Sequence, residues 1–121
     1  MEKNETFRKL CERVNNEILS YSTITKFYIG KTDNIEERSS DHKLHDFQET
    51  YPIATGEPET INDAEKYAIA YFKEKDAQRI ANVGSGGEGP DGTILYIALM
   101  YEIEVIEELS DMDIVFNPIK I

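Results

Sequence analysis

An uninterrupted apolar run near the end of the 121-residue chain constrains the fold more than any other feature. The run covers residues 93–101 and reads Thr-Ile-Leu-Tyr-Ile-Ala-Leu-Met-Tyr. A strand that carries apolar side chains on both faces is buried on both of them, which is the situation of a central strand. The sequence therefore predicts a sheet with structure packed against each of its faces.

Three other segments carry the signals of helices. Apolar residues recur every three or four positions in residues 5–19 and in residues 60–75, which is typical of amphipathic helices. The first of these helices is expected to pack on the core or to cover a surface that a substrate would otherwise contact. A third helix is expected from Asn34, which has N-cap chemistry, to about Leu44.

Two further strands are expected on the N-terminal side of the apolar run. Residues 24–29 are β-branched and aromatic, and Gly30 is expected to end this strand. Residues 47–53 alternate apolar with polar or small side chains. Pro52 restricts them to an edge strand, because proline donates no ladder hydrogen bond. The residues between this strand and the next helix, 56–60, are expected to form a loop.

The complete pattern predicts one α+β domain over residues 1–121, with a small mixed or antiparallel central sheet of about three to five strands flanked by helices. An extra N-terminal helix fills residues 1–20, the motif-bearing core fills residues 21–92, and C-terminal strands fill residues 93–121. The hydrophobic content of 40% and charged content of 31% are typical of globular proteins.

The net charge of −11 is confined to one part of the chain. Residues 1–45 hold eight basic and eight acidic side chains, whereas residues 46–121 hold five basic and sixteen acidic ones. Lysines and arginines that neutralise phosphates supply most of the affinity of a nonspecific DNA binder, so this composition excludes a broad basic surface. It permits a locally neutral or positive cleft near Lys26, Lys31 and Arg38.

Cysteine content and hydropathy narrow the class of protein further. Cys11 is the only cysteine, which excludes an internal disulfide and a cysteine cluster for zinc, and its place on the apolar side of a helix predicts a core residue. The sequence has neither a run of 18 apolar residues nor a signal-like amino terminus. We therefore expect a cytoplasmic or other intracellular protein without membrane partners, and a virus or mobile element would be an unsurprising source.

Distinctive chemistry gathers where the first strand meets the following helix. Arg38 and His42 are four residues apart, so they share one helical face beside the phenol of Tyr28. A fork-shaped cation, an imidazole and a phenol at one corner are suited to an anion. Singly, each has an ordinary structural explanation: Tyr28 as a core aromatic, Arg38 in a surface ion pair and His42 as a satisfied polar residue.

Two later positions complete the set of candidate residues. Glu65 lies beside the apolar face of its helix, where its carboxylate needs a partner: a lysine, a capping interaction or a divalent cation. Asn82 precedes residues 84–92, which hold five of the seven glycines. We expect a flexible surface connection there, although glycine-rich backbone can also approach a phosphate.

The ordered motifs resemble those of a known family. Tyr-Ile-Gly-Lys-Thr at residues 28–32, followed by Arg38 and His42, resembles the second half of the GIY-YIG nuclease signature, in which a Tyr-Ile-Gly strand precedes a helix with an essential arginine. Glu65 on a later helix and Asn82 before a glycine-rich turn match two further features in order. The chain is thus similar to the GIY-YIG endonuclease superfamily over most of its length.

The first half of that signature is degenerate. No Gly-Ile-Tyr tripeptide precedes residue 28, and the nearest aromatic candidate is Tyr21, which lies closer to Tyr28 than is usual in the family. The resemblance covers roughly residues 21–92. The sequence therefore does not assign the activation of the attacking water to one particular residue.

The resemblance implies a metal-dependent endonuclease. One carboxylate, here Glu65, is enough to hold Mg²⁺ or Mn²⁺, because such an ion keeps waters and takes other ligands from phosphate. Arg38 would stabilise charge on the phosphoryl oxygens. Tyr28, Tyr21 or His42 would handle the proton of the attacking water, provided that a cation lowers the phenol pKa from about 10. Substrate contacts are expected from Lys26, Gly30, Lys31 and Asn82.

Two functions stay open from the sequence. The first is hydrolysis of phosphodiester bonds in DNA or RNA that is branched, nicked or otherwise structured, with a recruiting protein partner because the surface is acidic. The second is a catalytically eroded GIY-YIG-like binding module, which uses its acidic surface to engage a basic protein partner.

Overall fold

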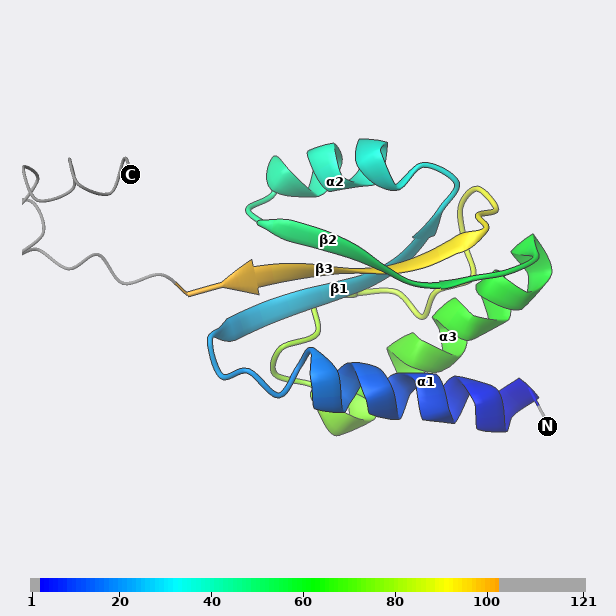
Figure 1. Cartoon of the computed structure of the whole chain (residues 1–121), viewed down its shortest axis with the longest axis horizontal. Helices are drawn as coiled ribbons and strands as arrows, with labels where there is room; N and C mark the ends of the chain where they lie inside the picture. The colour runs from blue at the N-terminus through cyan, green and yellow to red at the C-terminus, as the bar shows by residue number, and fades with distance from the viewer. Residues whose placement is uncertain (1–2, 103–121) are drawn as a thin grey trace, which may run out of the picture.

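The computed structural model describes residues 3–102 and arranges them in three layers (Figure 1). One antiparallel sheet lies in the middle, with one helix on one face and two helices on the other. The predicted α+β class and the presence of an N-terminal helix are confirmed. Strands expected beyond residue 102 lie outside the described residues. In chain order the elements are α1 (Lys3–Glu17), β1 (Ile24–Thr32), α2 (Ile35–Lys43), β2 (Glu49–Thr55), α3 (Pro58–Lys75) and β3 (Ile94–Tyr101).

The apolar run is the central strand, as predicted. The sheet order is β1-β3-β2, so β3 pairs on both sides and residues 95–99 are all buried. Both pairings are antiparallel, and the register sets Tyr28 opposite Ala98 and Gly30 opposite Tyr96. The strand that pairs with the Tyr-Ile-Gly strand is therefore the last one of the described chain.

The prediction that Gly30 ends the first strand is wrong. β1 continues to Thr32, and its last two residues pair with Leu95 and Ile94. The glycine is required by a close approach, because a Cβ at this position would lie 2.4 Å from the Tyr96 ring. It makes room for an aromatic side chain of the neighbouring strand and forms no turn.

Two prolines occupy different positions in the fold. Pro52 lies on the edge strand β2, where the register shifts before Ala54, so the predicted edge position is confirmed. Pro58, expected in a loop, instead opens α3 after the N-cap residue Glu57. Proline suits a first helical turn because its fixed φ is already helical and its missing N–H would have no partner there.

The main core lies between the sheet and the pair α1 and α3. Phe27 of β1 and Phe72 of α3 are both fully buried and meet edge to face, with ring centroids 5.4 Å apart. Cys11 of α1 is 2% exposed in the same core, as predicted, and burial raises its thiol pKa to about 12. Helix α1 therefore contributes packing, and its cysteine stays a thiol.

A smaller cluster lies on the opposite face, beneath α2. Its buried members are Phe47, Tyr96 and Ala98, with Tyr28 and Ile35 packed against them. Two of these five side chains are phenols, so this layer combines apolar packing with polar atoms. Of the candidate site residues, Tyr28 lies in this cluster, whereas Glu65 lies on α3, which packs on the other face of the sheet.

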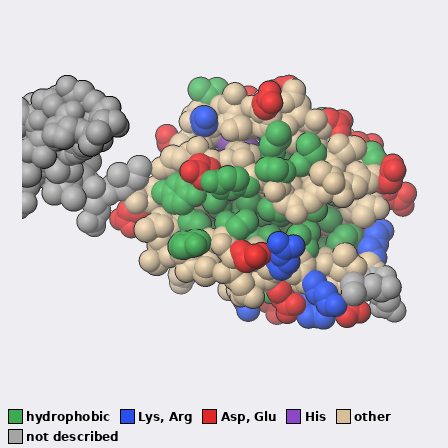
Figure 2. Space-filling view, in the orientation of Figure 1, with side chains coloured by type: hydrophobic (Ala, Val, Ile, Leu, Met, Phe, Trp, Pro, Cys, Tyr) green, Lys and Arg blue, Asp and Glu red, His purple; other side chains and the backbone are tan. Residues whose placement is uncertain are grey.

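Figure 2 shows an apolar area on the surface of the molecule. Hydrophobic side chains gather across the middle of this face, over the sheet and between α2 and α1, and charged side chains surround them. A shallow groove runs between α1 and β2 there, lined by Leu10, Val14, Ile18, Pro52 and Ile53 together with Arg13 and Glu17.

Candidate active site

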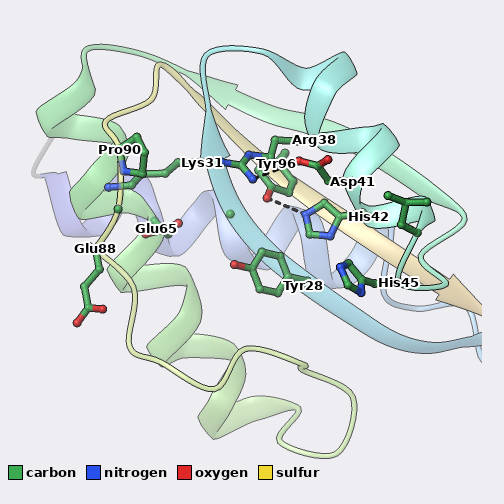
Figure 3. Close-up of a pocket in the computed structure, with 13 residues that line it drawn as sticks. Tyr28, Lys31, Arg38, Asp41, His42, His45, Glu65, Glu88, Pro90 and Tyr96 are labelled. Atoms are coloured by element: carbon green, nitrogen blue, oxygen red, sulfur yellow. Dashed lines mark hydrogen bonds and ion pairs between the residues drawn. The ribbon is translucent and has the colours of Figure 1, made fainter.

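A pocket of about 430 Å³ opens between α2, the sheet, α3 and the glycine-rich loop (Figure 3). It collects residues that are far apart in the sequence. Figure 3 shows Tyr28, His42 and Tyr96 on one side of the space and Glu65 of α3 across from them. Six of the nine predicted site residues line it: Tyr28, Gly30, Lys31, Arg38, His42 and Glu65.

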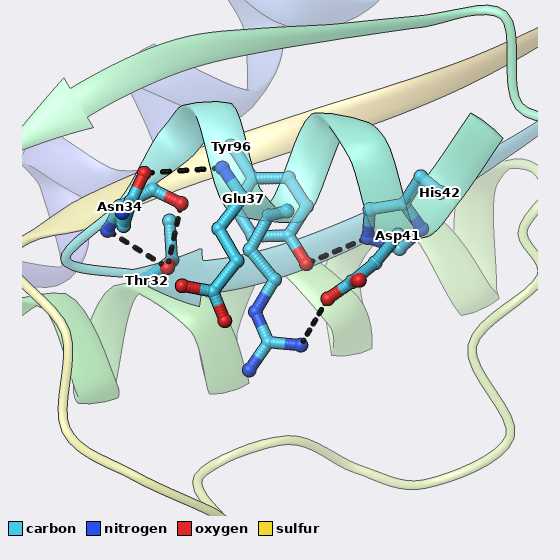
Figure 4. Close-up of polar contacts among 7 residues, drawn as sticks. Thr32, Asn34, Glu37, Asp41, His42 and Tyr96 are labelled. Carbon is cyan, nitrogen blue, oxygen red and sulfur yellow. Dashed lines mark hydrogen bonds and ion pairs between the residues drawn. The ribbon is translucent and has the colours of Figure 1, made fainter. Parts of the chain in front are cut away.

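The start of α2 is fixed directly after β1, which orients its functional face (Figure 4). The Asn34 side chain accepts a hydrogen bond from the Glu37 backbone N–H at 3.0 Å and caps the helix. The Thr32 hydroxyl accepts one from the Asn34 N–H at 3.0 Å. With only Asp33 and Asn34 between strand and helix, Arg38 and His42 both reach the pocket.

Arg38 keeps most of its hydrogen-bonding capacity available to a ligand. Its ion pair within the described residues is with Asp41, at 3.5 Å, and both side chains are partly exposed, at 41% and 51%. An exposed pair at this distance stabilises little. The guanidinium can therefore turn towards an anion in the pocket, for which its planar fork of donors is suited.

His42 and Tyr96 share a hydrogen bond of 2.8 Å between the imidazole Nε2 and the phenol oxygen. Burial, together with the nearby charge of Arg38, lowers the pKa of His42 below its usual 6.5. Burial raises the pKa of Tyr96 well above 10, and the neighbouring Tyr28 adds to the shift. At neutral pH the pair is a neutral imidazole next to a protonated phenol.

The Tyr28 phenol lies against the same histidine, with ring centroids 5.0 Å apart. Burial and the negative charge of Glu65 raise its pKa, and Arg38 opposes them only in part. The condition that a cation lowers this pKa is therefore not met. Tyr28 stays protonated and can donate a hydrogen bond, whereas the neutral imidazole of His42 can accept a proton.

The carboxylate of Glu65 is buried at the edge of the pocket. The residue is only 6% exposed, and its Oε1 accepts a hydrogen bond from the Gly87 backbone N–H at 2.7 Å. None of the ion pairs within residues 3–102 includes it. A buried carboxylate is costly unless it is compensated, so Glu65 fits the single protein ligand that Mg²⁺ needs.

No group of three or more histidine, cysteine or acidic side chains in the described part of the chain could hold a metal by itself. A dedicated protein cage of the kind that calcium uses is therefore absent from residues 3–102. Mg²⁺ does not require one, because it retains waters and shares the oxygens of a bound phosphate.

Asn82 lies outside the pocket but fixes the strand that carries Tyr28. Its Oδ1 accepts a hydrogen bond from the Ile29 N–H at 2.9 Å, and its Nδ2 donates one to the Ile29 carbonyl at 2.8 Å. Nearby, the Phe27 N–H donates a hydrogen bond to the Arg79 carbonyl, and the Phe27 carbonyl accepts one from the Ala81 N–H. The Asn82 side chain thus extends a short ladder along the outer edge of β1 and positions the phenol.

Of three further predicted site residues, one lies in the pocket wall and two lie outside the pocket. Lys31 lines the pocket but is only 8% exposed, and its Nζ donates to Asn62 Oδ1 at 2.5 Å. Lys26 is exposed on β1 and does not line the pocket. Tyr21 precedes β1, is 63% exposed and is also absent from the lining.

Sequence reasoning missed Tyr96, which supplies the second phenol of the pocket. The residue is 3% exposed and comes from β3, after Tyr28 in the chain rather than before it. A usable signal existed: it is the one side chain with a polar tip in the interior of an otherwise aliphatic strand. Its tip needs a hydrogen-bond partner when buried.

Comparisons with protein families, with curated protein sequences and with solved structures each found no match. Within residues 3–102, no helix is both long enough and apolar enough to cross a membrane.

Proposed function

We propose that this chain is a Mg²⁺- or Mn²⁺-dependent endonuclease of the GIY-YIG type, which hydrolyses phosphodiester bonds in DNA or structured nucleic acid. One observation carries the proposal. A phenol (Tyr28), a guanidinium (Arg38), an imidazole (His42) and a carboxylate (Glu65) converge on one pocket from β1, α2 and α3. These are the groups that phosphodiester hydrolysis needs.

Charge on the phosphate would be handled by residues on opposite walls of the pocket. Arg38 donates two parallel hydrogen bonds to phosphoryl oxygens, and the charge of Lys31 supports it from β1. Glu65 would hold the metal ion, which supplies further positive charge to the phosphate and the leaving oxygen. The Gly87 N–H keeps the Glu65 carboxylate oriented for this role.

Proton transfer is assigned to the His42–Tyr96 pair. The attacking water gives a proton to the Tyr96 oxygen while the Tyr96 hydroxyl proton passes to Nε2 of His42, so the phenol is neutral before and after the step. A neutral His42 at working pH is required, and the lowered pKa provides it. Tyr28 remains protonated and donates a hydrogen bond to the water or to the phosphate.

The test is cleavage of a panel of single-stranded, duplex, nicked and branched DNA and RNA with Mg²⁺, Mn²⁺ or EDTA. We expect metal-dependent cleavage of at least one substrate and loss of about 10²-fold or more in Arg38→Ala and Glu65→Gln. Arg13→Ala and Glu17→Gln alter an exposed ion pair on α1 and serve as matched controls. Equal inactivity of the wild type and Glu65→Gln across the panel would refute the proposal.

A second candidate function is the eroded binding module that engages a basic protein. It is favoured by an acidic cavity at the start of α3, where Glu57, Glu59 and Asp91 are part of the lining and no lysine or arginine of the described residues is. Binding of a polylysine peptide, measured by calorimetry at low and high salt, should then weaken in Glu57→Gln/Glu59→Gln and persist in Glu65→Gln. A binding affinity that is unchanged by high salt and by the Glu57→Gln/Glu59→Gln double substitution would exclude this function.

A further inference from the structure

A second cavity, which we call the side pocket, adjoins the candidate active site. Its volume of about 340 Å³ lies within the range of about 300–1,000 Å³ that is common for small-molecule sites. Tyr28, Glu65 and Glu88 line both cavities, so the two share a wall that carries the proposed chemistry. The remaining lining consists of Ile69, Ala81, Asn82, Val83, Gly84 and Gly86.

The charge of the side pocket is unsuited to a second phosphate. Within residues 3–102, no lysine or arginine lines it, while two carboxylates do. Lys73 is close by, but its Nζ donates to the backbone carbonyls of Val83 at 3.0 Å and Gly84 at 2.8 Å. That lysine therefore holds the rim of the cavity, and the cavity itself is suited to a neutral group.

The surface of the side pocket combines apolar walls with peptide groups. Ile69 and Ala81 form apolar walls, and the Tyr28 ring is available from the shared side. Val83 at the rim is 96% exposed, so its side chain contributes nothing to packing within the described residues. An aliphatic group on a backbone anchored by Lys73 can instead contact a flat apolar ligand at little entropic cost.

We propose that the side pocket receives the nucleobase of the nucleotide next to the scissile phosphate, turned out of the base stack. This inference rests on the proposed endonuclease function and adds its substrate class: nucleic acid with an unpaired nucleotide at the cleavage site. The candidate active site and the side pocket share Tyr28. A phosphate in the active site and the base of the same nucleotide in the side pocket would therefore be neighbours. Unstacked bases commonly bind to aromatic and apolar side chains.

The acidity of the chain supports the same substrate class. A net charge of −11 provides few phosphate contacts along a duplex, so affinity must come from elsewhere. A base that is already unpaired costs less to turn out than a paired one, which would make an unpaired nucleotide the preferred target.

The experiment uses a short DNA duplex with one unpaired 2-aminopurine, the same duplex fully paired, and a version with an abasic site in place of the unpaired base. Binding is measured in EDTA by 2-aminopurine fluorescence and by anisotropy, and cleavage is measured with Mg²⁺. We expect the unpaired base to improve both binding and cleavage about tenfold over the paired and abasic duplexes.

Two variants test the cavity itself. Val83→Ser removes the apolar rim, and Gly84→Leu adds bulk at a position where a Cβ meets nothing within 4 Å, so neither should disturb folding. Both should abolish the tenfold preference. Tyr51→Ser, at an exposed position on β2 outside both pockets, is the control and should retain it.

Each outcome separates the two proposals. Cleavage of all three duplexes at one rate, unchanged in Val83→Ser and Gly84→Leu, would overturn the base pocket and leave the endonuclease proposal standing. Preferential binding that depends on Val83 without any cleavage would support the base pocket and count against the endonuclease. Neither binding preference nor cleavage would overturn both.

Discussion

Replacing Gly30 by alanine should destabilise the fold and disturb the candidate site at the same time. A Cβ there would lie 2.4 Å from both Cζ and Oη of Tyr96. The ring has no easy escape, because it is 3% exposed and its hydroxyl is bonded to His42. Overpacking of this kind costs about 1–3 kcal/mol, and alanine recovers about 0.5–1 kcal/mol because glycine is unfavourable within a strand.

The net loss is therefore about 1 kcal/mol, or about 4 °C in Tm for a domain of this size. Urea unfolding followed by circular dichroism measures it. The control is Gly56→Ala, whose Cβ would meet Ile61 at an ordinary 3.6 Å, so its free energy of unfolding should be unchanged or slightly higher.

A double-mutant cycle isolates the clash. Gly30→Ala combined with Tyr96→Leu should lose less stability than the sum of the two single changes, because leucine removes the ring atoms that the new methyl group meets. Equal free energies of unfolding for Gly30→Ala and Gly56→Ala, or additive losses in the cycle, would refute the reasoning.

Two further predictions follow from the surroundings of the pocket. Asn82→Ala removes both partners of the Ile29 peptide groups and should cost about 2 kcal/mol in urea unfolding, whereas Asn82→Asp keeps the acceptor and should cost less; equal losses would contradict this account. The lowered pKa of His42 means that the unfolded chain binds its proton first as pH falls below about 6.5. Stability should therefore decline from pH 7 towards pH 5 more steeply in the wild type than in His42→Gln, and parallel pH profiles would exclude a buried neutral imidazole.

Local chemistry allowed much of the fold to be predicted. The two-faced apolar run identified β3 as central, Pro52 identified β2 as an edge, and Asn34 marked the start of α2. Each of these features acts within its own element, through burial, a missing donor or a cap. Glycine was harder to interpret, because Gly30 could equally mark a turn or a close approach, and only the neighbouring strand decides between them.

The candidate site was predictable where its residues share an element or follow a known order. Arg38 and His42 both line the pocket because they are one helical turn apart, and the place of Glu65 beside an apolar face predicts its need for a partner. The position of Tyr96 depends on a pairing between strands far apart in the sequence, which no local pattern encodes. The Gly87 N–H that satisfies Glu65 depends on the path of an irregular loop in the same way.

The position of β3 at the centre of the sheet also governs when the molecule can take shape during synthesis. Within the described residues, β1 and β2 pair with β3 and are not neighbours of each other. A ribosome makes residues 94–101 after both, so neither edge strand of the emerging chain has its partner in the sheet until β3 leaves the exit tunnel. Closing such long loops is slow relative to forming local helices. A half-made chain thus has helices but no assembled cleft, and whatever reaction the cleft performs is withheld until translation has passed Tyr101.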